Sequence, residues 1–259
     1  MPPVNLVTRR LLAIPVFILT ISLFNPAWAD DDVEATPYRP TVANPAELSA
    51  PGWLELEGGW IASSGDGTNH KGVPYTAKLA FDKDWGILLD GELWAREDAV
   101  SGVGDSSFLL KHRIPTADKD QNFGIEAGFR LPIAARGLGS GKPDWIVNSI
   151  YSLDFADNWR LDANAGAVRL GAPDLGAGRV ALQWATSLST GRGPWTFAGE
   201  LSGSHQSGNS NSLQYLAAVS YAVTPKLVVD AGLSTAHQGG QDTHAFFFGA
   251  TWLAGRLFK

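Results

Sequence analysis

Acidic and basic residues recur in this sequence at alternate positions of short apolar segments. Eight acids and six bases have this spacing: Glu55, Glu57, Asp90, Glu92, Glu126, Asp162, Glu200 and Asp230, with Lys78, Arg96, Lys111, Arg113, Arg130 and Arg160. Side chains two positions apart project from the same face of a β-strand. We therefore expect these charges to share one side of a sheet. There they would either select small polar solutes or close the interior with ion pairs.

Catalytic and metal chemistry have little support in the sequence. His205 and Ser207 are two positions apart, as a Ser–His pair of a lipid-cleaving barrel enzyme would need. They lie in a loop-like stretch, however, and no orienting Asn or Asp follows from the pattern. His112 is expected at the end of a strand, where an imidazole ring at the membrane interface needs no catalytic explanation. Cys is absent, and neither residues 30–32 nor residues 64–69 have the spacing of a calcium loop. We predict no enzymatic activity, no cofactor and no metal site.

The elements that position the charges are predicted to be strands. From Trp53 onward, twelve segments of about ten residues alternate in polarity between turn signals, without a helical period. Five short links alternate with six longer, Gly-rich links, as periplasmic turns and external loops do in outer-membrane barrels. The sequence therefore predicts an all-β fold over residues 53–259, a transmembrane antiparallel up-and-down β-barrel of about 12 strands. The last segment, from His244 to Phe258, is apolar on both faces in places, which leaves its register open.

Four aromatic residues each follow a short turn on the apolar face: Trp85, Phe123, Trp159 and Trp195. Such rings suit the headgroup layer, so we expect a periplasmic aromatic girdle. The alternative is a soluble barrel or sandwich that buries its apolar faces inward. The small residues on those faces and the mixed charges on the opposite faces favour the membrane barrel.

The N-terminus has the order of a cleaved secretory signal peptide. Arg9 and Arg10 precede an apolar run from Leu11 to Phe24, and small residues end at Ala29, so residues 1–29 are excluded from the fold. Residues 30–52 are rich in Pro and Ala, and they could thread into the lumen as a plug or remain a flexible periplasmic leader. Their composition favours the leader. The predicted localisation is the outer membrane of a Gram-negative bacterium.

The charge balance limits the possible partners. Removal of residues 1–29 takes two arginines and no acid, which leaves 18 basic against 26 acidic residues and a net charge near −8. Nucleic acid is excluded, because its phosphates require basic patches. The expected partners are outer-membrane lipid, the barrel assembly machinery and a small-molecule solute. The terminal Lys259 departs from the aromatic end by which the assembly machinery usually recognises such barrels.

Three stretches carry a resemblance to a known family. The first runs from Arg39-Pro40 to Pro51-Gly52 and the strand that follows, the second is Gly102-Val103-Gly104-Asp105, and the third joins Leu131-Pro132 to the Gly-rich residues 137–144. In this order over residues 39–155 they resemble the outer-membrane proteins of the MetA-pathway of phenol degradation family. The resemblance implies a transporter-like barrel and the passage of aromatic or other small hydrophobic compounds.

The sequence is compatible with three functions. The leading hypothesis is a passive channel or transporter for small molecules. The alternatives are a non-conducting structural barrel and, third, a lipid-acting enzyme. A lumen blocked by ion pairs or by residues 30–52 would favour the structural barrel, whereas a continuous wet path would favour transport.

Overall fold

The computed structural model describes residues 33–65 and 69–259, and all of its regular structure is β. The strands are β1 (Trp53–Gly65), β2 (Asn69–Ala80), β3 (Trp85–Glu97), β4 (Val100–Gly102), β5 (Ser106–Ile114), β6 (Gln121–Leu131), β7 (Asp144–Phe155), β8 (Trp159–Arg169), β9 (Val180–Arg192), β10 (Trp195–Gln206), β11 (Ser212–Thr224), β12 (Leu227–Gln238) and β13 (Gln241–Arg256). No helix among the described residues is long and apolar enough to cross a membrane. The predicted signal peptide, residues 1–29, lies outside the described residues.

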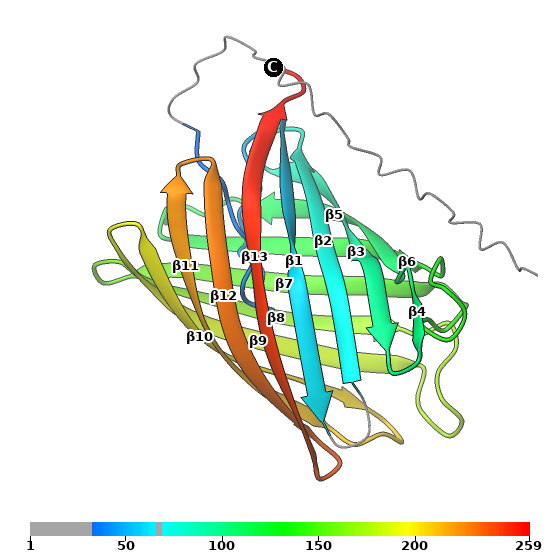
Figure 1. Cartoon of the computed structure of the whole chain (residues 1–259). Helices are drawn as coiled ribbons and strands as arrows, with labels where there is room; N and C mark the ends of the chain where they lie inside the picture. The colour runs from blue at the N-terminus through cyan, green and yellow to red at the C-terminus, as the bar shows by residue number, and fades with distance from the viewer. Residues whose placement is uncertain (1–32, 66–68) are drawn as a thin grey trace, which may run out of the picture. The chain divides into compact units, whose positions relative to one another are not determined.

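Twelve long strands close into a ring of antiparallel pairs. Each strand pairs with the next, β3 pairs with β5, and β13 returns to β1, while the short β4 folds back on β3 (Figure 1). Closure removes the free sheet edges that a membrane cannot tolerate. The predicted fold, a transmembrane barrel of about twelve strands, is confirmed.

The outer wall of the barrel is apolar and exposed, as a lipid-facing surface must be. Outward side chains such as Leu89, Ile125, Phe197 and Leu233 are between 40% and 61% exposed. The last strand is apolar on both faces because Phe247 and Leu253 point into the interior, where both are buried, while Phe246 and Trp252 remain exposed. This arrangement settles the register that the sequence left open.

The links differ in length at the two ends of the barrel. We call the end that carries the turns at Asp82 and Gly193 the short-turn end, and the opposite end, which carries the longest links, the long-loop end. The link from β12 to β13 was predicted to be long, but it lies at the long-loop end and consists only of Gly239 and Gly240. The Asp82 side chain shapes the first of these turns, because its carboxylate accepts the backbone N–H groups of Asp84 and Trp85 at 2.7 and 2.8 Å. These two bonds hold the pKa of Asp82 below its usual value.

The chain before β1 lies inside the barrel. Residues 33–52, here called the lumenal segment, have no regular structure of their own, yet Tyr38, Ala43 and Ala46 are buried. Figure 1 shows this segment in dark blue behind β12 and β13. Composition favoured a flexible leader, but the described residues lie against the inner wall. The reason is a set of polar wall side chains described below.

Candidate functional site: a charged lumen and two cavities

Wall side chains satisfy the backbone of the lumenal segment. A buried segment without secondary structure must find partners for its N–H groups elsewhere. Seven of them donate to wall side chains at 2.7–3.1 Å: Thr36 to Glu55, Tyr38 and Arg39 to Glu57, Val42 and Ala43 to Glu200, Asn44 to Asn164 and Ala46 to Ser152. The acids of β1 and β10 thus bind a stretch of the same chain.

Two buried lysines hold the segment from its carbonyl side. The ammonium of Lys78 donates to the Thr36 carbonyl at 2.5 Å, and that of Lys111 donates to the Pro45 carbonyl at 2.6 Å. The ring of Tyr38 lies between them, with the two ammonium groups 3.8 and 4.2 Å from its centroid. Cation–π attraction is strongest when the cation is desolvated, and neither lysine is more than 2% exposed.

The same lysines are neutralised by the wall acids. Lys78 lies 2.5 Å from carboxylate oxygens of both Glu55 and Glu57, and Lys111 lies 3.1 Å from Glu126. A buried charge is tolerated only when it is paired in this way. The alternation of acids and bases in the sequence therefore becomes a network whose centre is the lumenal segment.

Side chains of the segment complete the network. The guanidinium of Arg39 binds both carboxylate oxygens of Asp230 at 3.0 and 3.1 Å. Glu47 forms an ion pair with Arg160 and accepts a hydrogen bond from Asn122 at 2.9 Å. Arg160 also binds Asp162 at 3.1 Å. The bidentate Arg39–Asp230 contact and the contacts of Glu47 fix the segment at two points of the ring.

Two of the remaining predicted lumen residues, Arg113 and Arg130, lie toward opposite ends of the barrel. Arg113 binds Asp84 at 2.9 Å at the short-turn end, and Arg130 binds Asp144 at 3.2 Å near the long-loop end. A carboxylate oxygen of Glu92 lies 2.9 Å from Nε2 of His70. Asp90 is half-buried on the same face of β3. Arg113 and Arg130 therefore do not form one central constriction.

Arg96 was expected in the lumen, and that prediction is wrong. The pairing of β2 with β3 shifts by one residue, because Val73 pairs with Trp94 whereas Pro74 pairs with Glu92. This bulge inserts Leu93 and reverses the alternation after it. Ala95 consequently turns inward and is 2% exposed, whereas Arg96 is exposed on the outer face.

The four aromatic residues predicted for the girdle lie on the outer wall at the short-turn end. Their exposed fractions are 41% for Trp85, 42% for Phe123, 40% for Trp159 and 45% for Trp195. Three of them pack on a neighbouring strand: Trp85 stacks on His112, Phe123 contacts Tyr151 and Trp195 contacts Tyr221, with ring centroids 4.0–4.9 Å apart. Half-exposed rings at one height suit a membrane interface.

Two cavities lie on either side of the lumenal segment. The long-loop cavity has a volume of about 410 Å³, and the short-turn cavity has a volume of about 520 Å³. Val42 lines the first, while Arg39 and Thr41 line the second. The segment therefore divides the lumen into two compartments.

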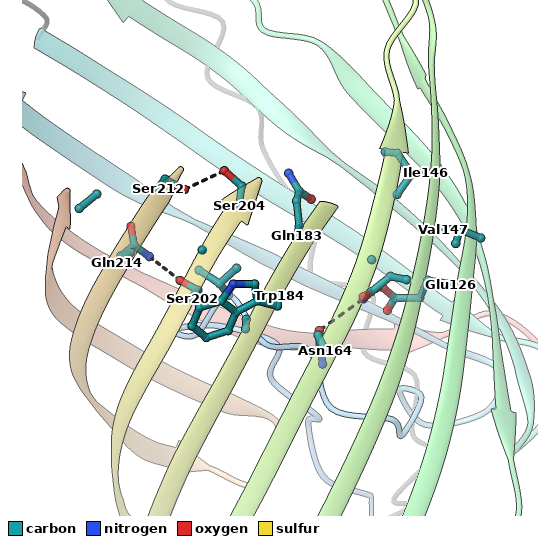
Figure 2. A pocket seen from close by; sticks show the side chains of 16 residues that line it. Glu126, Ile146, Val147, Asn164, Gln183, Trp184, Ser202, Ser204, Ser212 and Gln214 are labelled. Atoms are coloured by element: carbon teal, nitrogen blue, oxygen red, sulfur yellow. Dashed lines mark hydrogen bonds between the residues drawn. The ribbon is translucent and has the colours of Figure 1, made fainter. Parts of the chain in front are cut away.

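The long-loop cavity has a mixed lining (Figure 2). Its amide and hydroxyl groups come from Asn148, Asn164, Gln183, Ser202, Ser204, Ser212 and Gln214, and its apolar groups include Val42, Ile146, Ala185 and Ala236. Ser204 and Ser212 bond each other at 2.7 Å, and Gln214 donates to Ser202 at 3.3 Å. Glu126 is the one charged residue among the described residues that line it. The cavity suits a neutral molecule with an apolar body and a hydrogen-bonding group.

The proposed Ser–His pair is incomplete in the described residues. His205 does have an orienting partner that the sequence pattern did not reveal, because its Nδ1 lies 2.7 Å from Oδ1 of Asn211. A hairpin between β10 and β11 brings these residues together across six positions. Ser207 forms no described side-chain bond to His205, however, and its carbonyl accepts the N–H of Gly178 at 2.7 Å.

No family model and no curated protein matches the sequence. Solved structures do match its fold. The COG4313 outer membrane channel from Pseudomonas putida F1 is similar with a TM-score of 0.64 and 11% identity, over 80% of this chain and 97% of that one. A NanC porin structure has a TM-score of 0.56 and 10% identity, over 77% and 98%. The CymD monoaromatic hydrocarbon channel has a TM-score of 0.50 and 9% identity, over 81% and 90%.

These likenesses establish the fold as that of the outer-membrane β-barrels. All three similar structures are named as channels or porins. None carries the MetA-pathway name, so membership of that family stays a prediction.

Proposed function

We propose that this protein is an outer-membrane channel for the passive passage of small aromatic or hydrophobic compounds that carry a hydrogen-bonding group. Its N-terminus targets it for export, and its long loops face the outside. The observation that carries the proposal is the long-loop cavity, whose lining of amides, hydroxyls and apolar groups holds a single charged residue, Glu126, in a barrel otherwise rich in charge. The name of the similar monoaromatic hydrocarbon channel adds support for the solute class.

The lumenal segment controls passage in this proposal. It separates the two cavities, so a solute can cross only when the segment moves or is displaced. The segment is held by hydrogen bonds and ion pairs rather than by a sheet, and such contacts can be exchanged for water one at a time. We therefore infer a channel with low conductance at rest.

The second candidate is a non-conducting structural barrel. A specific observation favours it, since ion pairs and the lumenal segment fill the interior between the two cavities. A permanently closed barrel would have the same wall and the same contacts. The two candidates differ in whether the segment ever leaves its place.

Single-channel recording in planar lipid bilayers separates the two candidates. We expect the mature chain to give small or rare conductance steps, and a variant lacking residues 33–50 to give larger and steadier steps. Phenol should reduce the current of the variant by occupying the long-loop cavity, while inositol, a polyol of similar size without an apolar face, should not. A folded, heat-modifiable deletion variant without conductance would establish the structural barrel.

If the deletion variant does not fold, a reversible disulfide between the lumenal segment and the wall provides a second test. The chain has no Cys, so Asn44→Cys with Asn164→Cys introduces a single possible disulfide. These two positions are joined by hydrogen bonds in both directions, at 2.8 and 2.9 Å. Oxidation should abolish the conductance steps and a reductant should restore them. Steps that persist in the oxidised protein would show that the lumenal segment does not control the path.

A further inference from the structure

Two basic residues lie directly opposite each other on the outer wall. Lys71 of β2 and Arg96 of β3 are paired in register, and both are exposed. Like charges in this position destabilise a sheet. The ion pairs formed among the described residues include neither side chain. An anion bound between them would remove the repulsion.

The position of this pair along the barrel is informative. Trp60 and Trp94 stack on the outer face with their centroids 5.7 Å apart, and Arg96 follows Trp94 by two residues on that face. Stacked tryptophans on a membrane barrel mark the headgroup level. Lys71 and Arg96 therefore lie one step beyond that level, toward the long-loop end.

The bulge at Leu93 is what turns Arg96 outward. Without the inserted residue, Ala95 would face the lipid and Arg96 would face the lumen, where the other strand charges lie. The fold thus places a guanidinium beside the Lys71 ammonium on the outer wall. Its Nε donates to the Asp98 carbonyl at 3.0 Å, which fixes the plane of the group and leaves its two terminal nitrogens for a ligand.

A hollow adjoins the two basic residues. Small side chains, Ala62 and Ser64 of β1 and Asn69 of β2, line it together with Lys71 and Arg96, and its volume is about 490 Å³. Asp98 also lies at its edge, where its carboxylate accepts the backbone N–H of Asn69 at 3.0 Å. That bond ties the one described acid at the hollow to the end of the strand.

We propose that Lys71 and Arg96 bind a phosphate group of the lipid A in the outer leaflet around the barrel. A fixed guanidinium beside an ammonium is a strong phosphate site, and basic residues next to an aromatic belt recognise anionic headgroups. The proposal rests on the orientation given under the proposed function, in which the long loops face the outside.

Binding of lipid A to the full mature chain tests the proposal. The refolded protein in neutral detergent is titrated with diphosphoryl lipid A, and binding is followed by the fluorescence of the adjacent tryptophans and by lipid retained on size exclusion. The variants are Lys71→Gln, Arg96→Gln and the double change. Lys119→Gln, in an exposed turn at the opposite end, is the matched control.

The double variant should bind diphosphoryl lipid A about tenfold more weakly or worse, while the control binds as the unaltered protein does. Dephosphorylated lipid A should bind the unaltered protein no better than the double variant. Equal binding by all variants, with unchanged heat-modifiable mobility, would overturn the site. Displacement of lipid A by equimolar inorganic phosphate would overturn the lipid as its ligand. Neither outcome depends on conductance, so the channel proposal is tested separately.

Discussion

The two halves of the lumen use one continuous wall in opposite ways. Toward the short-turn end, Lys78 and Lys111 are almost fully buried among carboxylates and segment carbonyls. Toward the long-loop end, strands β7 to β11 present serines, glutamines and asparagines around an open volume. The buried lysines come from β2 and β5, so the difference lies both in which strands carry the charges and in the height at which they carry them.

In this barrel, the buried charges hold a segment of the chain rather than a solute. Each contact between the lumenal segment and a charged wall side chain compensates for the water that this side chain loses when it is buried. The neutral half needs no such compensation, because its amides and hydroxyls can bond to water or to each other. Solute specificity is therefore expected in the neutral half and control of passage in the charged half.

The largest expected effect is the loss of a buried lysine. Lys111→Met removes the partner of Glu126 and of the Pro45 carbonyl, which should cost about 3–5 kcal/mol of unfolding free energy. Urea titration of the barrel in lipid vesicles, read by heat-modifiable mobility, measures it. Gln183→Met in the long-loop cavity is the control and should cost less than about 1 kcal/mol. Equal losses of unfolding free energy in the two variants would contradict the proposed difference between the two halves of the lumen.

A smaller loss of unfolding free energy is expected when only a side-chain contact of the lumenal segment is removed. Arg39→Ala removes the bidentate bond to Asp230 and should cost about 2 kcal/mol, because it deletes a charge-assisted pair in which the Arg39 side chain is 16% and the Asp230 side chain 2% exposed. The conductance steps should become more frequent at the same time. Arg136→Ala, in an exposed loop, should change neither quantity. If the Arg39 variant is destabilised but its conductance is unchanged, Arg39 stabilises the fold and does not control passage.

Filling the neutral half should alter the solute response with little change in stability. Ser204→Trp projects an indole ring into the long-loop cavity, where it would fill about a fifth to a half of the cavity volume. We therefore expect phenol to block the current several-fold more weakly. The unfolding free energy should change by less than about 1 kcal/mol. The matched control is Ser101→Trp on β4, which is exposed. A phenol block that survives in the Ser204 variant would place the solute elsewhere.

The smallest effect concerns charges outside the wall. The pKa of Asp82 is lowered in the folded state, so its contribution is present above the unfolded pKa and is lost as the pH falls through the folded pKa, below about pH 4. Asp82→Asn should slightly lower stability in the neutral region and leave it unchanged below the folded pKa, which flattens the acid limb of stability against pH. The thermal midpoint between pH 2.5 and 7 measures this. A large loss at neutral pH would mean that turn charges matter as much as lumenal ones.

Much of the wall could be predicted from the sequence because a barrel strand has a strict period of two. The buried positions of Glu55, Glu57, Lys111 and Glu126 follow from that period alone. Arg96 could not be placed, since a bulge changes the period by one residue and leaves no distinctive mark in the composition. The partner of His205 was missed for a similar reason, because Asn211 reaches it only through the turn of a hairpin.

The sequence by itself determined the strands, their faces and the membrane barrel, because alternation acts between near neighbours along one chain. Only the tertiary structure decided where residues 33–52 lie. Their N–H groups bond to side chains 18 to 158 positions away, on four strands, β1, β7, β8 and β10, that come together only when the barrel closes. A Pro- and Ala-rich segment has no pattern that records such partners. Its place is set by the geometry of the wall around it.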